Sequence, residues 1–185
     1  NVTGGSGDDF LYGNGLNNVL LGGPGNDWLE GRAGDETYVF DTDSPWGSET
    51  VVESIAESGH DILDFSGTTT RKINLNMLLL GVAQVINTNL TLTLNGEGVE
   101  EVIGGSLNDT IFGNGNNNTL RGGPGQDVLS GKNGDDVLDG GVGNDDLDGG
   151  DGTDTINEIA DTDFTLTNNS LTRGTGEVDK LNNIE

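Results

Sequence analysis

The sequence has no cysteine and one histidine among its 185 residues. Without cysteine, the chain can form neither a disulfide framework nor a thiolate metal site. The single histidine, His60, excludes a pair of histidine metal ligands within one chain. Neither an HExxH nor a GxSxG motif occurs, so the signatures of zinc proteases and serine hydrolases are missing. We therefore predict a protein that is not an enzyme.

Basic residues are also scarce, with 7 Lys and Arg against 32 Asp and Glu, which gives a formal net charge of −25. Such a charge disfavours binding to nucleic acid or to an anionic membrane. No apolar stretch is long enough to span a bilayer, so no membrane insertion is expected. Apolar residues make up 31% of the chain. This balance indicates disorder, a halophilic surface or a chain that folds around cations.

Glycine, in contrast, is abundant, with 33 residues, and it marks a nine-residue frame, Gly-Gly-x-Gly-x-Asp-x-Leu-x. The frame occurs four times across residues 4–39 and six times across residues 104–157. The eighth residue is always large and apolar, a regularity that disordered acidic tracts do not have. A strict period of this kind predicts a stacked solenoid. Residues 4–39 and 104–139 are identical at 19 of 36 positions, which indicates duplication of a whole unit.

The sixth position of the frame carries an oxygen-bearing side chain in every copy. In order, these residues are Asp9, Asn18, Asp27, Glu36, Asp109, Asn118, Asp127, Asp136, Asp145 and Asp154. Glycine permits tight turns with positive φ in which several carbonyl oxygens crowd together. A set of about six oxygen ligands is what Ca²⁺ prefers. We therefore predict calcium sites, with the alternative that some of these carboxylates only cap their own turns.

The ten frames resemble the RTX, or hemolysin-type, calcium-binding nonapeptide repeats. The resemblance implies that two consecutive frames form one coil of a right-handed parallel β-roll, with calcium between frames i and i+2. Four pairs follow from that register: Asp9–Asp27, Asp109–Asp127, Asp127–Asp145 and Asp136–Asp154. Asn118–Asp136 implies a weaker site, and Asn18–Glu36 lacks both aspartates. About four to six Ca²⁺ ions are expected.

The same resemblance implies that backbone carbonyls of the turns complete the calcium shells. The expected carbonyl ligands are those of Gly22, Gly23, Pro24, Gly25, Gly122, Gly123, Pro124, Gly125, Gly131, Lys132, Asn133, Gly134, Gly140, Gly141, Val142 and Gly143.

Four segments are predicted, and together they form an all-β solenoid of two arrays joined by irregular β coils. They are a first array (1–39), a linking region (40–103), a second array (104–157) and a β tail (158–185) that leads into a further repeat unit. The last residues followed by the first match the pattern of residues 98–106, so we expect the chain to be an excerpt of a longer tandem series.

Alternating apolar residues and turn residues predict six short strands in the linking region. They are expected at residues 50–55, 61–65, 72–75, 84–86, 90–94 and 99–103. One short helix, at residues 77–82, is expected as a cap or a side excursion.

The sequence thus predicts a calcium-binding β-roll module whose folding is driven by extracellular Ca²⁺. We expect a structural or spacer part of a type I-secreted exoprotein or adhesin, located outside the cell or at the bacterial cell surface and monomeric in isolation. Two alternatives stay open: an adhesive module that binds a glycan or a surface partner, and an accessory domain of a secreted enzyme.

Overall fold

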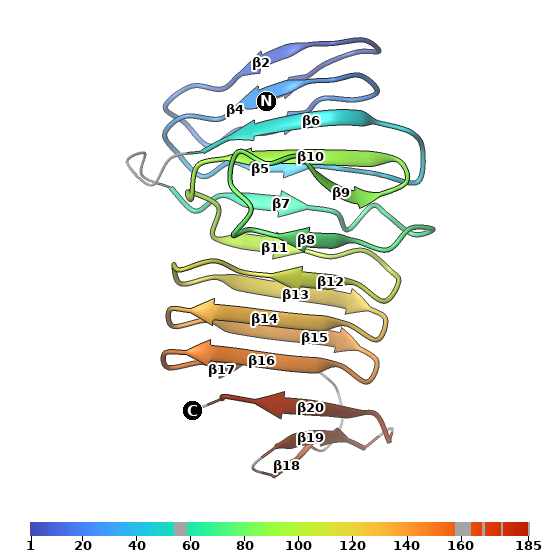
Figure 1. Cartoon of the computed structure of the whole chain (residues 1–185), viewed down its shortest axis with the longest axis vertical. Coiled ribbons are helices and arrows are strands. Elements are labelled where there is room, and N and C mark those ends of the chain that lie inside the picture. Colours follow the sequence, from blue (N-terminus) through green and yellow to red (C-terminus); the bar gives the residue numbers. More distant parts are fainter. Residues whose placement is uncertain (54–58, 158–163, 168, 175, 185) are drawn as a thin grey trace.

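A computed structural model describes residues 1–53, 59–157, 164–167, 169–174 and 176–184. Within these ranges the chain is a stack of β-strands without a helix, with the first coils at the top of Figure 1 and the last at the bottom. The predicted all-β class and parallel roll are confirmed. No helix in these ranges is long and apolar enough to cross a membrane.

Three sheets build the stack. The continuous sheet contains β1 (Val2–Thr3), β3 (Val19–Leu21), β5 (Thr37–Val39), β7 (Ile62–Asp64), β11 (Glu101–Ile103), β13 (Thr119–Pro124), β15 (Val137–Val142) and β17 (Thr155–Ile156). The N-terminal sheet contains β2 (Phe10–Tyr12), β4 (Trp28–Glu30), β6 (Gly47–Val52), β10 (Leu90–Asn95) and β9 (Gln84–Asn87). The C-terminal sheet contains β8 (Asn74–Asn76), β12 (Thr110–Phe112), β14 (Val128–Asn133), β16 (Asp146–Asp151), β20 (Val178–Asn182), β19 (Ser170–Arg173) and β18 (Phe164–Thr167).

Residues eighteen positions apart lie in register within the arrays, so two frames make one coil. Leu11 pairs with Leu29 in the N-terminal sheet, and Ile111 pairs with Leu129 in the C-terminal sheet. Every strand pair of the continuous sheet is parallel. Each strand therefore repeats the environment of the strand one coil earlier.

The apolar eighth position of each frame forms the core. Nine of these ten side chains are buried, and Ile156 is partly buried against them. The non-repeat coils supply matching residues, since Val51 lies opposite Leu29 and Leu63 lies opposite Tyr38. Burying a leucine contributes about 1.5–3 kcal/mol. One apolar column therefore passes through both arrays and the linking region.

The linking region departs from a simple coil in one place. β6, β7 and β8 continue parallel pairing, but β9 turns back and pairs antiparallel with β10. The predicted helix at 77–82 is wrong, because this stretch forms turns. Met77 is buried in the core and Leu80 packs against it, while Leu78 and Leu79 are exposed. The N–H of Met77 donates to the carbonyl of Phe112. The backbone thus bonds to neighbouring strands instead of to its own residues four positions away.

Strands form both within the stretch predicted at residues 50–55 and in the β tail. β6 begins earlier than predicted, and residues 54 and 55 of that predicted strand lie outside the described ranges. In the tail, β18, β19 and β20 pair antiparallel, and β20 stacks parallel on β16 as the next coil would.

In six of the ten frames the second position has a left-handed backbone, which favours glycine there. Gly123, for example, has φ of 98°, and L-residues avoid this region. Lys132 and Arg32 occupy the same position with φ of 86° and 78°. Lys132 Nζ lies 4.4 Å from the centroid of Phe112, and Arg32 sits over Tyr12 in the equivalent place. These cation–π contacts offset part of the backbone strain.

Replacing Leu129 by alanine tests the stacked core. Leu129 is fully buried in β14, so we expect the free energy of unfolding in saturating calcium to fall by about 2–5 kcal/mol. The neighbouring Val128 is 40% exposed, and its replacement by threonine should change stability by about 0.5 kcal/mol or less. Urea denaturation of both variants measures the difference. Equal losses would contradict the inward orientation of the eighth position.

Candidate metal centres

A repeated hydrogen bond joins each sixth-position carboxylate to the coil before it. The backbone N–H of Asp109 donates to Oδ1 of Asp127 at 2.7 Å, and the N–H of Asp127 donates to Oδ1 of Asp145 at 2.8 Å. The same bond joins Asp9 to Asp27, Asn118 to Asp136, and Asp136 to Asp154, at 2.7–2.9 Å. The structure therefore brings together the four pairs expected from the register, and the Asn118–Asp136 pair as well.

In several of these carboxylates the second oxygen is buried beside a glycine and has no hydrogen-bond donor among the described residues. This holds for Oδ2 of Asp27, Asp127, Asp136 and Asp154, whose residues are 1–2% exposed. A Cβ on Gly122 would collide with Asp127 Oδ2 and lie 2.6 Å from the carbonyl oxygen of Gly140. Carboxylate and carbonyl oxygens thus face the same space between turns. A buried oxygen without a donor is costly unless a cation neutralises it, so these residues fit Ca²⁺.

Burial raises the pKa of the sixth-position carboxyls. The pKa of Asp127 rises to about 7, and those of Asp109 and Asp136 rise to about 6. Loss of hydration is the largest cause in all three, because it disfavours the ionised form. Neighbouring carboxylates add to the shift at Asp127 and Asp136. A bound cation would lower these pKa values, because it stabilises the ionised carboxylates.

The first frames of each array differ from the inner ones. Oδ2 of Asp9 accepts the N–H of Gly5, and Oδ2 of Asp109 accepts the N–H of Gly105. The amide oxygens of Asn18 and Asn118 do the same with the N–H four residues earlier. At these positions the side chain caps its own turn, as the architectural alternative supposes.

Two different contacts occur among the expected carbonyl ligands. The carbonyls of Pro24 and Val142 accept the N–H groups of Gly7 and Gly125, so they hold adjacent turns together. The carbonyl oxygens at the first position of the frame instead point at the glycine one coil earlier, beside its carboxylate. Among the expected ligands, these are the carbonyls of Gly22, Gly122, Gly131 and Gly140.

Sequence reasoning missed four residues that occupy the sixth position in coils without a full frame. Their places follow from strand register: Glu49, Asp61, Glu100 and Asp179. The N–H of Asp61 donates to Glu100, and the N–H of Asp145 donates to Asp179. Three of the four follow the half-frame Gly-x-Asp/Glu-x-apolar, as in Gly47-Ser48-Glu49-Thr50-Val51. This half-frame is the signal that could have found them.

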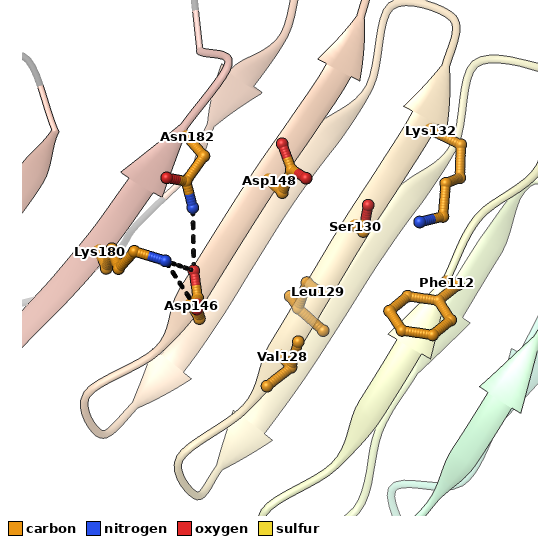
Figure 2. A pocket seen from close by; sticks show the side chains of 9 residues that line it. All are labelled: Phe112, Val128, Leu129, Ser130, Lys132, Asp146, Asp148, Lys180 and Asn182. Carbon is orange, nitrogen blue, oxygen red and sulfur yellow. Dashed lines mark hydrogen bonds and ion pairs between the residues drawn. The ribbon is translucent and has the colours of Figure 1, made fainter.

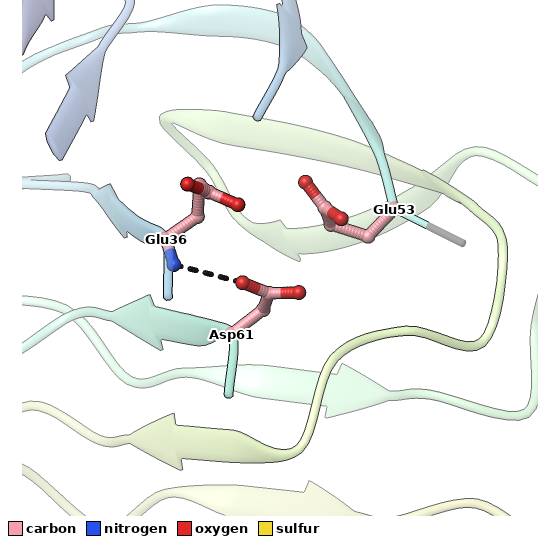
Figure 3. A group of neighbouring side chains, drawn as sticks. All are labelled: Glu36, Glu53 and Asp61. Atoms are coloured by element: carbon pink, nitrogen blue, oxygen red, sulfur yellow. Dashed lines mark hydrogen bonds between the residues drawn. The ribbon is translucent and has the colours of Figure 1, made fainter. Parts of the chain in front are cut away.

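Three carboxylates meet where the first array ends. Ligand atoms of Glu36, Glu53 and Asp61 lie within 4.8 Å of one another, and all three residues are buried (Figure 3). The N–H of Glu36 donates to Asp61 at 2.8 Å, while the hydroxyl of Tyr38 donates to Glu53. Burial raises the pKa of Asp61. Glu36, which sequence analysis paired with Asn18, belongs to this oxygen-rich cluster, whose composition suits a hard cation.

A groove of about 240 Å³ lies on the outer face of the C-terminal sheet (Figure 2). Lys132 covers the ring of Phe112 on one side. On the other side, Lys180 and Asn182 both donate to Asp146. Cationic, amide and apolar groups therefore meet in a chain that is otherwise strongly acidic.

The sequence pattern of the RTX calcium-binding nonapeptide repeat matches this chain in four copies. They cover residues 1–15, 12–44, 94–129 and 121–156, which together exceed half of the chain. Curated protein sequences gave no match. Among solved structures, the crystal structure of the extracellular lipase LipA from Serratia marcescens is similar, with 19% sequence identity and a TM-score of 0.33. That likeness covers 98% of this chain and 38% of the lipase chain.

The raised pKa values predict how pH affects the calcium-free protein. The carboxyls of Asp109, Asp127 and Asp136 have a higher pKa in the folded form than the ordinary value of 3.8. Their contribution to stability is therefore complete below about pH 4 and is lost as pH rises through about 6–7. After calcium is stripped on a chelating resin, far-UV circular dichroism should show more β-structure near pH 4 than near pH 8. A β-signal that is constant over this range would contradict the shifts.

Proposed function

Because this chain belongs to the RTX calcium-binding nonapeptide repeat family, we propose that it is a non-catalytic module that folds around Ca²⁺ as a structural or spacer part of a secreted bacterial protein. Repeats of this family bind Ca²⁺ and have a structural role. The proposal extends this to the coupling of calcium binding with folding, and to the location of the protein.

One observation carries the proposal. Inner frames bury a carboxylate oxygen without a donor, beside a carbonyl oxygen of the next coil, as at Asp127 and Gly140. Coils stack in register, so uncompensated carboxylates would repel their neighbours above and below. Calcium supplies the missing positive charge at each step. Its binding free energy therefore becomes part of the free energy of folding.

The stabilisation that calcium binding adds suits a chain that is unfolded in the cytosol and folded outside the cell. Each tenfold excess of free calcium over a site's dissociation constant adds about 1.4 kcal/mol of stability. Extracellular calcium modules commonly have dissociation constants of about 10⁻⁴–10⁻³ M. With a net charge of −25, the calcium-free chain repels itself and expands. We propose that it stays unfolded in the cytosol, passes through a type I secretion channel and folds outside the cell.

A calcium titration tests the coupling directly. Far-UV circular dichroism of calcium-stripped protein at pH 8 should show little β-structure, and added Ca²⁺ should restore it cooperatively. Magnesium at the same concentration should restore much less, because it demands near-ideal octahedral geometry and keeps several waters. Complete β-structure in the stripped protein at this pH, unchanged by calcium, would refute the proposal.

The Asp127→Asn variant tests whether the predicted carboxylate pairs bind the calcium that drives folding. Asp127 is shared by the Asp109 and Asp145 pairs, so the substitution should raise the calcium midpoint of folding by about tenfold. Asp151→Asn is the matched control, since Asp151 is exposed in the same array. Its midpoint should stay close to that of the unchanged protein.

A second candidate function is adhesion through the groove on the C-terminal sheet. The ring of Phe112 and the neighbouring ammonium group of Lys132 line this groove, and an apolar ring beside a polar donor suits contact with a saccharide. A glycan array at constant calcium should then show binding that Lys132→Met weakens and that Lys72→Met, at an exposed site elsewhere, does not. An array without binding would leave the structural role as the only one of these two functions.

A further inference from the structure

The first coil after the first array keeps the register of the frames although its sequence does not. Trp28 of β4 pairs with Thr50 of β6, which places Glu49 opposite Asp27. The turns are joined as well, since the N–H of Gly25 donates to the carbonyl of Trp46 and the N–H of Ser48 donates to Asn26. Residues 45–93 lie between the stretches that match the repeat family. A non-repeat residue thus occupies the place of the next repeat carboxylate.

Glu49 and Asp27 are both buried, and their oxygens point to one space. Glu49 is 1% exposed and Asp27 is 2% exposed. A Cβ on Gly22 would collide with Asp27 Oδ2 and lie 3.0 Å from Glu49 Oε2. Neither oxygen of Glu49, nor Oδ2 of Asp27, has a hydrogen-bond donor among the described residues. Asp27 Oδ2 and Glu49 Oε2 therefore face one buried space beside Gly22, and neither has a geometrically defined hydrogen-bond partner among the described residues.

At the N-terminal end of the second array, where β8 precedes β12, the carboxylate of the first frame is fully hydrogen-bonded. There Ile73 occupies the sixth position next to Asp109, and its N–H donates to Asp109 Oδ1. Oδ2 of Asp109 accepts the N–H of Gly105, so both carboxylate oxygens are satisfied by the backbone. Asp27 and Glu49 have no such arrangement. Oδ2 of Asp27 and the oxygens of Glu49 thus lack the backbone hydrogen bonds that both oxygens of Asp109 accept.

The column of sixth-position carboxylates on this edge ends one coil after Glu49. Leu92 of β10 lies directly opposite Glu49 and is fully buried, so no oxygen ligand follows Glu49 on this edge. Within the described part of the chain, no lysine, arginine or histidine forms an ion pair with Glu49 or Asp27. The pKa of Glu49 is raised to about 9 by burial and by the Asp27 carboxylate. The pair therefore lacks any positive partner from the protein.

We propose that Asp27 and Glu49 hold a divalent, oxygen-preferring cation at the junction between the first array and the linking region. The inference rests on the proposed calcium-dependent function and adds a site whose second carboxylate lies outside every nonapeptide. Two carboxylates and nearby turn carbonyls form the hard oxygen set that Ca²⁺ takes. This site fixes the first non-repeat coil onto the last repeat coil. Folding of the linking region then depends on calcium as well.

Counting bound ions tests the site. Equilibrium dialysis of the full chain against Ca²⁺ should show one ion fewer per chain for Glu49→Gln than for the unchanged protein. Glu97→Gln is the matched control, because Glu97 loses the same charge from an exposed turn and should keep the full number. Glu49→Leu copies the natural residue Leu92 and should fold with the same reduced number, which guards against a folding defect of the glutamine variant.

Terbium luminescence locates the lost ion. Both tryptophans of the chain are close to this site in sequence, since Trp28 follows Asp27 and Trp46 precedes Glu49 by three residues. Excitation of tryptophan with bound Tb³⁺ should therefore give emission that Glu49→Gln and Glu49→Leu lower and Glu97→Gln does not. An unchanged ion count and unchanged emission in both Glu49 variants would overturn the site while leaving calcium-dependent folding intact. Absence of calcium binding in the unchanged protein would instead refute the proposed function.

Discussion

The contact on which the rest of this structure depends is the buried carboxylate between two coils. One oxygen accepts a backbone N–H from the coil before, as Asp127 does from Asp109. The other lies in a space shared with a carbonyl oxygen of the following coil. Backbone donors satisfy only half of the carboxylate, and a cation would neutralise the oxygen that faces this space. Burial and hydrogen bonding thus prepare a binding site rather than a finished core.

This contact explains why glycine opens the frame and why an apolar residue stands at its eighth position. The turn must pass so close to the carboxylate that a Cβ on Gly122 would collide with Asp127. The eighth position then directs a side chain such as Leu129 inward, where it stacks on the same position of the next coil. A change of register by one residue would expose the core and bury the polar neighbours. Turn, ligand and core are therefore fixed by the same nine residues.

The linking region keeps only part of this arrangement. Its coils retain the half-frame that carries the carboxylate and the core residue, as in Gly59-His60-Asp61-Ile62-Leu63. They lack the paired glycines that open most frames of the arrays. The continuous sheet therefore crosses the region without a break, whereas the opposite face divides into two sheets, and β10 and β9 are the last strands of the N-terminal one (Figure 1).

The repeat by itself indicated a stacked solenoid and its core positions, because a fixed period places equivalent residues above one another. The resemblance to RTX repeats supplied the two-frame coil and the pairing of carboxylates within the arrays. Only the tertiary structure decided that Glu49 follows Asp27, that Asp61 follows Glu36 and that Leu92 ends a column. These partners are separated by insertions of unequal length. Their register depends on how each excursion folds back onto the stack, which no constant spacing in the sequence encodes.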